Sequence, residues 1–514
     1  RTTFPAADGV PVQRVHADLV PDFAARRCAP LHDELVAESA RAFNITAGPL
    51  WRLRLYRESD ERGTLLIVLH HLIADGRSSA ILFREFADAY KARQEGFEWA
   101  PTPLPVQYAD YSLWLAERLK VPAVLAERDY WRATLGGAPP LLDLPADHAR
   151  PAEQSFAGAW IRREIDAASL DALRGLGQAN SSTLFMVLLS VFQLLLHRWS
   201  GQDDLVVGTP VAGRGLAEFD ELVGLFINTV IVRCRLARAS TIADLLASTR
   251  EATLGAFAHQ ELPFEVLVED LKPDRSLSHA PVFQAMFNLT PIPSRVRQAG
   301  PLCFRLGELI EHGVSNFDLS LNVGEHDDGA ALIFEYDTAL FDAATIERFA
   351  DQYLLMLEQL PAMPYARLAD IELLGPGEAD QLRSWEGTSR TVASPRLVHE
   401  LVADAAAQRP DAIALVDGDR ELSYADLQSL SQAYSNRLRE LGVGRGCLVA
   451  IALPRGIELV GALLGALGTG AAYMLVDPEQ PPARLAAILE QGQPVVVVGQ
   501  GGAATWAGGF VWLE

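Results

Sequence analysis

Short apolar runs of strand type and of helix type alternate in the last part of the chain. Strand-like runs at residues 447–453, 471–476 and 495–498 are separated by runs with helical spacing at 457–467 and 484–490. Strands that alternate with helices pair in parallel, because each helix returns the chain to the same end of the sheet. The pattern predicts an α/β fold with a parallel sheet in this region.

The preceding sequence has the same mixed character. Residues 64–69 are typical of a strand, and a helix is expected from about Ser78. Further on, the sequence predicts a helix over 183–199, with Ser182 as its N-cap, and a strand over 222–232. These elements make the whole chain α/β.

Changes in composition and in hydrophobic periodicity predict how the chain is divided into regions. Residues 361–397 are rich in Pro and Gly and lack a sustained period, which is typical of a linker, and we expect this linker to pack on its neighbours. The segments 1–150 and 151–360 precede it, and a third region, 398–514, follows. The chain starts at Arg1 and ends on a strand-like run, so we expect it to be a piece of a longer protein.

Charge and hydropathy exclude two classes of partner. The chain has 44 Lys and Arg against 66 Asp and Glu, a formal net charge of −22, which opposes binding to phosphate backbones and anionic lipid. The most apolar segment, 184–196, is shorter than the roughly 20 residues that cross a bilayer. We therefore expect neither nucleic acid nor a membrane as a partner.

The cysteines bear on metal binding and on cellular location. They are far apart in the sequence, with no Cys-x-x-Cys pair and no His at metal-ligand spacing: Cys28, Cys234, Cys303 and Cys447. Neither a disulfide framework nor a metal site is indicated, and a reducing cytoplasm fits this usage best.

Residues 70–76, HHLIADG, carry the clearest sign of chemistry. They lie where an apolar strand ends and a turn begins, a rigid place from which an imidazole can reach solvent. A histidine, with an ordinary pKa of about 6.5, can accept a proton near neutral pH. Asp75 could pair with an arginine and fix the loop, while Gly76 would allow close backbone approach or a positive φ. A zinc site of the HExxH type does not fit, because Leu72 stands where the Glu would be.

The heptad alone leaves two interpretations open, since adjacent histidines at a strand end can also be an ordinary surface pair. Further motifs lie on both sides of it: RTTF at 1–4, YADYSLW at 108–114, VGLFINTVIVR at 223–233, HQELPFE at 259–265 and RSLSHAPV at 275–282. Together, and in this order, they resemble the motifs of non-ribosomal peptide synthetase condensation domains, whose signature HHxxxDG is matched in full. The resemblance covers roughly residues 1–360.

The resemblance implies a fold and a place for the site. Domains of this family resemble chloramphenicol acetyltransferase folded twice in one chain. Residues 1–150 would form an N-lobe, incomplete at its N-terminus, and 151–360 a C-lobe. The two lobes would form a V-shaped pseudo-dimer with the active site in a tunnel between them.

The resemblance also implies roles for the heptad. His71 would point into the tunnel and His70 would be structural. Asp75 would be a salt-bridged scaffold residue, with Arg233 and Arg275 as the partners to test first. A backbone N–H at the Asp75–Gly76 turn is a candidate donor to the tetrahedral oxyanion.

Other motif residues have structural explanations of their own. Trp114, Tyr108 and Phe226 are more often core packing than substrate contacts, and Asn228 more often bonds backbone than substrate. The segment 315–320 resembles the family's FDLSL strand, in which Ser320 can line the tunnel.

The implied reaction is amide formation, in which an acceptor amine attacks a donor thioester and a thiol is released. His71 would accept the amine's proton or hold its neutral form. No cofactor would be bound covalently to this chain, since upstream donor and downstream acceptor peptidyl carrier domains would bring 4'-phosphopantetheine. Ester formation on a hydroxyl acceptor and a silent docking scaffold for carriers or a tailoring enzyme are the alternatives.

The third region resembles a different domain. Residues 422–427 and 467–478 are similar to the LTYxEL and LKAGxAYxPxDP motifs of adenylation domains. Region 398–514 would then be the N-terminal part of such a domain, whose remainder is a further expected partner. By itself it could not activate an amino acid.

Overall fold

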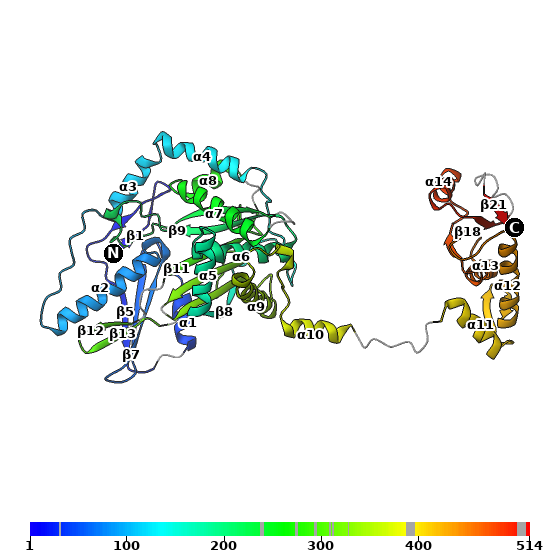
Figure 1. The fold of residues 1–514 in the computed structure, drawn as a ribbon. Helices are drawn as coiled ribbons and strands as arrows, with labels where there is room; N and C mark the ends of the chain where they lie inside the picture. The colour runs from blue at the N-terminus through cyan, green and yellow to red at the C-terminus, as the bar shows by residue number, and fades with distance from the viewer. Residues whose placement is uncertain are drawn as a thin grey trace. The chain divides into compact units, whose positions relative to one another are not determined.

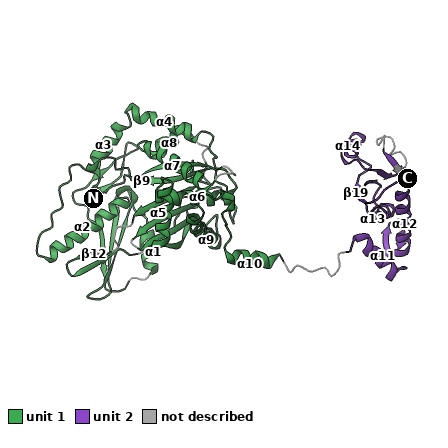
Figure 2. Ribbon diagram, viewed as in Figure 1, with its two compact units in different colours: residues 1–386 green, residues 387–514 purple. Residues whose placement is uncertain are grey.

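The computed structural model describes residues 1–29, 32–236, 241–272, 276–291, 296–307, 310, 313–326, 328–386, 396–500 and 510–513. Contacts divide the chain into two compact units, residues 1–386 and 387–514 (Figure 2). Residues 361–386, part of the predicted linker, pack with the first unit. Leu368 and Ile371 are buried there, and the Arg198 guanidinium donates to their carbonyl oxygens at 3.2 and 3.5 Å.

The N-terminal part of the first unit contains a three-stranded sheet of β5 (Asp22–Arg26), β6 (Trp51–Arg57) and β7 (Gly63–Leu69). β5 and β6 are parallel, and β6 and β7 are antiparallel. From β7 the chain passes through the short 3-10 helix η1 (His71–Ile73) into α2 (Gly76–Gln94) (Figure 1). The predicted strand at 64–69 and the helix after it are confirmed. Short strands and α1 complete this part: β1 (Thr2–Thr3), β2 (Ala6–Ala7), β3 (Val10–Pro11), β4 (Arg14–Val15) and α1 (His32–Ala40).

A six-stranded sheet forms the centre of the rest of the unit, in the order β10-β9-β11-β14-β15-β8. Its members are β8 (Gly158–Asp166), β9 (Asp204–Val211), β10 (Asn228–Arg235), β11 (Ala285–Pro291), β14 (Leu319–His326) and β15 (Gly329–Asp337). β11 runs parallel to both β9 and β14, and the other neighbours are antiparallel.

Helices cover the sheet and share the core with its strands. The helix α6 (Leu184–Ser200) is the clearest case, because eleven consecutive residues from Met186 to Leu196 are buried. The other helices near this sheet are α5 (Ala167–Ala179), α7 (Ile242–Ala258), α8 (Phe264–Leu271) and α9 (Ala343–Gln359). Elements outside it are α3 (Tyr108–Arg118), α4 (Pro122–Leu135), α10 (Pro376–Trp385), η2 (Ala217–Phe219), η3 (Leu360–Ala362) and η4 (Leu368–Asp370).

Two local predictions are wrong. The N-cap of α6 is Thr183 and not Ser182, because the Thr183 hydroxyl accepts the Met186 N–H at 3.3 Å. The strand predicted over 222–232 begins only at Asn228. Residues 222–227 form a loop whose apolar members Leu222 and Phe226 are buried, so their pattern reflects loop burial and not a strand.

A hairpin from the second half of the unit packs on α2. It consists of β12 (Val296–Ala299) and β13 (Leu302–Arg305), which follow β11 in the sequence and lie beside α2 (Figure 1). Arg297 donates to Asp88 of α2 at 2.9 Å. The Phe304 ring contacts three aromatic rings on the same helix: Phe83, Phe86 and Tyr90.

The second unit confirms the alternating pattern. Its four-stranded sheet has the order β19-β18-β20-β21, with all neighbours parallel. The elements are α11 (Val398–Gln408), β16 (Ile413–Asp417), β17 (Arg420–Ser423), α12 (Tyr424–Glu440), β18 (Leu448–Ala452), α13 (Ile457–Gly468), β19 (Ala472–Leu475), α14 (Pro482–Gly492), β20 (Val496–Gly499) and β21 (Val511–Leu513). Both units are therefore α/β.

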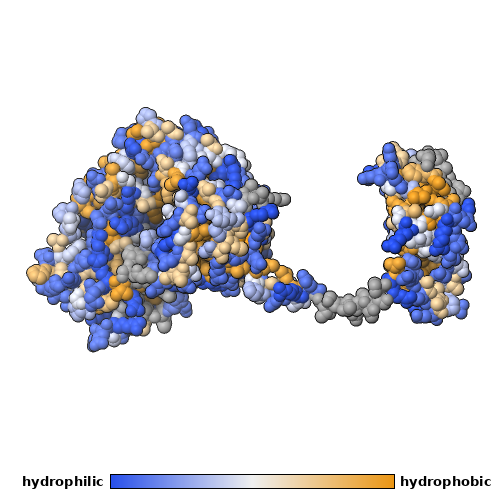
Figure 3. All heavy atoms as spheres, viewed as in Figure 1, coloured by the Kyte–Doolittle hydropathy of each residue, from blue (hydrophilic) through white to orange (hydrophobic). Residues whose placement is uncertain are grey.

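In the described part of the chain, no single helix is long and apolar enough to cross a membrane. Only the bent pair of α5 and α6, which meet at 96°, satisfies length and composition when the two are taken together. Polar and apolar residues are interspersed over the viewed face of both units (Figure 3).

Candidate active site

The two histidines of the heptad have different surroundings. His70 Nδ1 accepts the Leu72 N–H at 3.1 Å and so caps η1, which leaves the proton of the neutral ring on Nε2. The edge of the Phe43 ring also contacts the imidazole, with centroids 5.8 Å apart. Burial, and secondly His71, lowers the pKa of His70, which favours the neutral form. His70 thus holds the turn in shape.

His71, the predicted catalytic residue, is exposed on this turn. No side chain or backbone group among the described residues makes a hydrogen bond to its imidazole. Both ring nitrogens are therefore available to an incoming molecule, while the chain on either side is fixed by His70 and Asp75.

Asp75 is almost completely buried and caps α2. Its Oδ1 accepts the N–H and the hydroxyl of Ser78, each at 2.7 Å, and its Oδ2 accepts the Phe226 N–H at 3.2 Å. The Ser78 hydroxyl oxygen in turn accepts the Gly224 N–H at 3.0 Å. These bonds join the start of α2 to the loop that precedes β10.

Arg214 is the ion-pair partner of Asp75, a residue that sequence reasoning missed. Its Nη2 lies 3.1 and 3.2 Å from the two carboxylate oxygens, and the two side chains are only 4% and 1% exposed. Arg214 also donates to the carbonyl oxygens of Phe219 and Leu222, and its guanidinium stacks over the Phe226 ring at 3.9 Å. The sequence offers only the Gly213-Arg214 pair shortly after β9, which does not by itself indicate a partner for Asp75.

The expectation that Arg233 pairs with Asp75 is wrong. Arg233 makes a two-pronged ion pair with Asp204, at 2.8 and 2.6 Å, and donates to the carbonyl oxygens of Thr134 and Gly136. It thereby ties the end of α4 to the sheet. Arg275, the other expected partner, lies outside the described residues.

The motif aromatics form one packed cluster behind Asp75. Tyr111, Phe219 and Phe226 are buried, and the partly buried Trp114 and Tyr108 pack on them. The Tyr108 hydroxyl donates to the Leu225 carbonyl oxygen at 2.6 Å, and burial raises its pKa to about 12. This agrees with the prediction of core packing.

Asn228 bonds only backbone among the described residues. Its Nδ2 donates to the Gln260 and Leu262 carbonyl oxygens, both at 2.8 Å. Its Oδ1 accepts the N–H groups of Phe264 and Thr229 at 2.9 and 2.8 Å. Asn228 therefore holds the HQELPFE loop against the start of β10, as a backbone-bonding role predicts.

Gly76 and Ser320 remain candidates for contact with substrate. Gly76 does not have a positive φ, so that explanation of the glycine is wrong. A Cβ at this position would meet no atom within 4 Å, so space is open beside its backbone. Ser320 lies on β14, opposite Met286 and Glu335, and is 3% exposed.

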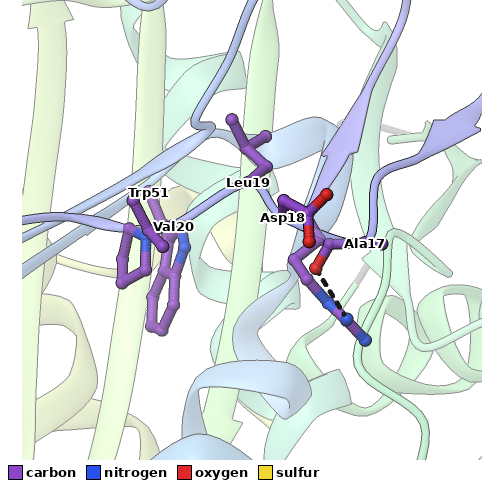
Figure 4. Close-up of a pocket in the computed structure, with 7 residues that line it drawn as sticks. Ala17, Asp18, Leu19, Val20 and Trp51 are labelled. Carbon is purple, nitrogen blue, oxygen red and sulfur yellow. Dashed lines mark hydrogen bonds between the residues drawn. The ribbon is translucent and has the colours of Figure 1, made fainter.

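Two open surface hollows lie away from the predicted catalytic residues. One lies near the N-terminus, where Trp51 and residues 17–21 form its wall and Arg1 donates to the Ala17 carbonyl oxygen at 3.2 Å (Figure 4). The other lies around Phe156 and His279. Among the described residues, no group of three His, Cys, Asp or Glu side chains could hold a metal ion.

The model of the Condensation domain family matches residues 1–383. The chain belongs to the condensation-domain family. A second model, AMP-binding enzyme, matches residues 402–507, so the condensation domain is followed by part of an adenylation domain.

Relatives place this condensation domain among nonribosomal peptide synthetases. The chain is 35% identical to tyrocidine synthase 3 of Brevibacillus parabrevis, covering 97% of this chain and 8% of the relative. It is 32% identical to gramicidin S synthase 2 of Aneurinibacillus migulanus, covering 97% of this chain and 11% of the relative. The chain thus spans only about a tenth of the length of either protein.

Solved structures share the fold. A holo four-domain nonribosomal peptide synthetase bound to AMP and glycine matches all of this chain and 40% of its own, with a TM-score of 0.76 and 23% identity. The X-domain from teicoplanin biosynthesis matches 73% of this chain and 86% of its own, with a TM-score of 0.65 and 26% identity.

Proposed function

We propose that this condensation domain forms an amide bond between two carrier-bound substrates, with His71 as the residue that handles the proton. The observation that carries the proposal is the contrast within residues 70–76. His71 is exposed without a hydrogen-bonding partner among the described residues, while His70 on one side is fixed by a hydrogen bond and Asp75 on the other by a buried ion pair. Such a free imidazole on a rigid turn suits a group that must meet a substrate.

The reaction balances without an added reactant. The acceptor amine nitrogen attacks the carbonyl carbon of the donor thioester, a C–N bond forms, and the C–S bond breaks. One amine proton passes through His71 to the departing sulfur, giving an amide and a thiol. The ammonium form of an α-amine has a pKa of about 7.7 to 8.0, so most of the acceptor is protonated near neutral pH. A base that accepts the ammonium proton, or holds the neutral amine, therefore increases the reactive fraction.

The negative charge of the tetrahedral intermediate needs a donor. Gly76 is the first residue of α2, so its N–H has no acceptor within the helix, and a Cβ built on this residue would meet no atom within 4 Å. The positive end of the helix dipole adds to this N–H. We assign the oxyanion to this position.

The proposal includes partners and surroundings. Upstream donor and downstream acceptor peptidyl carriers would deliver both substrates on 4'-phosphopantetheine arms, and the rest of the adenylation domain would be a further partner. The site would lie in a tunnel between an N-lobe, residues 1–150, and a C-lobe, residues 151–360, with Ser320 as a lining residue. The four cysteines are free in the structure, which suits the cytoplasm as the place of reaction.

A single-turnover assay with loaded donor and acceptor carriers tests the function. We expect His71→Ala to lower the rate by about 10²- to 10⁴-fold, the range of general acid–base catalysis. His148→Gln, on the same unit and half exposed beside Asp342, should leave the rate unchanged. Equal rates for wild type and His71→Ala would refute the role of His71.

The same assay separates the alternatives. An amine acceptor and its hydroxyl analogue are compared under identical loading. Faster product formation with the hydroxyl acceptor would favour ester synthesis. Carrier binding without product from either acceptor would favour a docking scaffold.

A further inference from the structure

The six-stranded sheet splits between β9 and β11. These parallel strands pair only at Ala285 with Val207 and at Met286 with Gly208. Beyond these positions β9 continues to Val211 and β11 to Pro291 without pairing to each other. The two strands therefore diverge toward their C-terminal ends.

Both sides of the split are attached to the segment that carries His71. Three residues after β9, Arg214 binds Asp75 at the start of α2. After β11 the chain reaches the β12–β13 hairpin, whose Arg297 binds Asp88 farther along the same helix. The strands on either side of the split are thus each followed by a segment that is anchored on α2, the helix after the catalytic turn.

Two asparagines lie on the face of β11 and β14 opposite to their core residues. In β11 and β14 the residues Ala285, Phe287, Leu319 and Leu321 enter the hydrophobic core. Since side chains alternate along a strand, Asn288 and Asn322 lie on the opposite face, where they are direct register partners. Ser320 precedes Asn322 on that face.

Their carboxamides are only partly used. Asn288 Nδ2 donates to Asn322 Oδ1 at 3.4 Å, and the Thr290 hydroxyl donates to Asn288 Oδ1 at 3.3 Å, both long for hydrogen bonds. Among the described residues, no acceptor is found for Asn322 Nδ2. Both residues are half-buried, so these N–H groups are available but partly withdrawn from water.

We propose that Asn288 and Asn322 form a subsite that binds a secondary amide of a carrier-tethered chain. A carboxamide offers both a donor and an acceptor, which matches the C=O and N–H of an amide. The inference rests on the proposed function, because that function supplies carrier-tethered chains as substrates. The amide could belong to the acyl part of a peptidyl donor or to the pantetheine arm.

Matched donors test the inference. Peptidyl donors are compared with analogues in which the first acyl amide, or one pantetheine amide, is replaced by two methylenes. In the wild type we expect the relevant replacement to lower kcat/KM by about 5- to 20-fold, since each net hydrogen bond contributes roughly 1 kcal/mol and 1.4 kcal/mol is tenfold. The replacement that lowers kcat/KM shows whether the bound amide belongs to the acyl part of the donor or to pantetheine.

Substitutions of the two asparagines provide the second half of the test. Asn322→Ala and the bulkier Asn322→Leu should lower kcat/KM for the intact donor by the same 5- to 20-fold and leave the amide-free donor unchanged. Asn288→Ala repeats the test from the neighbouring strand. Asn436→Ala, on the exposed face of α12 in the second unit, is the matched control and should affect neither donor.

The outcomes separate the two proposals. The subsite is overturned if the wild type uses the amide-containing and amide-free donors equally. It is also overturned if variants with an unchanged unfolding midpoint lose the same factor on both donors. Absence of product from every donor in the wild type would instead overturn the proposed function.

Discussion

Arg214 Nη2 lies 3.1 Å and 3.2 Å from the carboxylate oxygens of Asp75, although the two residues are 139 positions apart in the chain. The contact joins the segment after β9 to the first turn of α2. The turn that carries His71 therefore has its geometry fixed by a residue from the second half of the same unit. Because this ion pair is buried, its loss should lower the free energy of unfolding as well as the activity.

Removal of either charge should destabilise the first unit strongly. A single substitution, Asp75→Ala or Arg214→Ala, leaves the other charge buried and unpaired, which typically costs about 3–5 kcal/mol. We expect each variant to lower the free energy of unfolding by that amount in urea titrations. The double variant should lose less than the sum, because neither charge is then left unpaired.

An exposed ion pair provides the control. Arg383 and Asp380 on α10 are 71% and 73% exposed, and such a pair contributes less than about 1 kcal/mol. Arg383→Ala should therefore leave the urea midpoint almost unchanged. If Arg214→Ala has an equally small effect, the buried pair does not hold the turn.

The sequence predicted that Asp75 needs a cationic partner but not which one. The heptad places an aspartate at a helix start, and its motif implies a scaffold role, so local pattern was sufficient for Asp75 itself. The identity of the cationic partner of Asp75 depends on how two segments far apart in the sequence meet in the fold. Local sequence periodicity carries no information about such a contact. The motif made Arg233 the expected partner, but Arg233 forms its ion pair with Asp204 on the adjacent strand β9.

Gly224 is required by the ring of Tyr108. A Cβ at residue 224 would lie 2.1 Å from Tyr108 Cδ2, so Gly224→Ala must displace a packed aromatic ring. Overpacking of this kind costs about 1–3 kcal/mol, which thermal unfolding should detect. Gly215 precedes the same loop and has no atom within 4 Å of its hypothetical Cβ, so Gly215→Ala should be neutral.

Tyr108→Ala in combination with Gly224→Ala tests the cause. The smaller side chain removes the clash, so the double variant should be more stable than the two separate losses predict. Strictly additive losses would mean that the ring and the glycine do not constrain each other.

Asn228→Asp separates the two halves of the Asn228 carboxamide. The aspartate can still accept the Phe264 and Thr229 N–H groups, but it cannot donate to the Gln260 and Leu262 carbonyl oxygens. Its charge would instead face these two oxygens. We expect faster limited proteolysis within residues 259–264, and an unchanged cleavage pattern would contradict the bridging role.

Strands and helices with a clear period were predicted well, because burial of one face imposes that period on the sequence. The parallel strands β18, β19 and β20 and the helices between them are examples. Residues 222–227 were predicted wrongly as part of a strand. This loop packs under Tyr111 and Phe219, and a buried loop needs apolar residues just as a buried strand does. In the site, the roles of Asn228 and Trp114 followed from residue type, whereas the Arg214 contact and the split between β9 and β11 depend on tertiary structure.

His70 should make stability depend on pH in a defined direction. Burial, and secondly His71, lowers the pKa of His70 below its usual 6.5, so the folded chain binds this proton less readily than the unfolded chain. The contribution of His70 to the free energy of unfolding is therefore fully present above pH 6.5, and it is lost as the pH falls through the pKa of His70 in the folded chain. We expect the urea midpoint to decrease between about pH 7 and pH 5. In His70→Asn the amide oxygen can still accept the Leu72 N–H, but the residue no longer titrates, so the decrease should be smaller. An identical pH dependence in wild type and variant would show that His70 is not the titrating group.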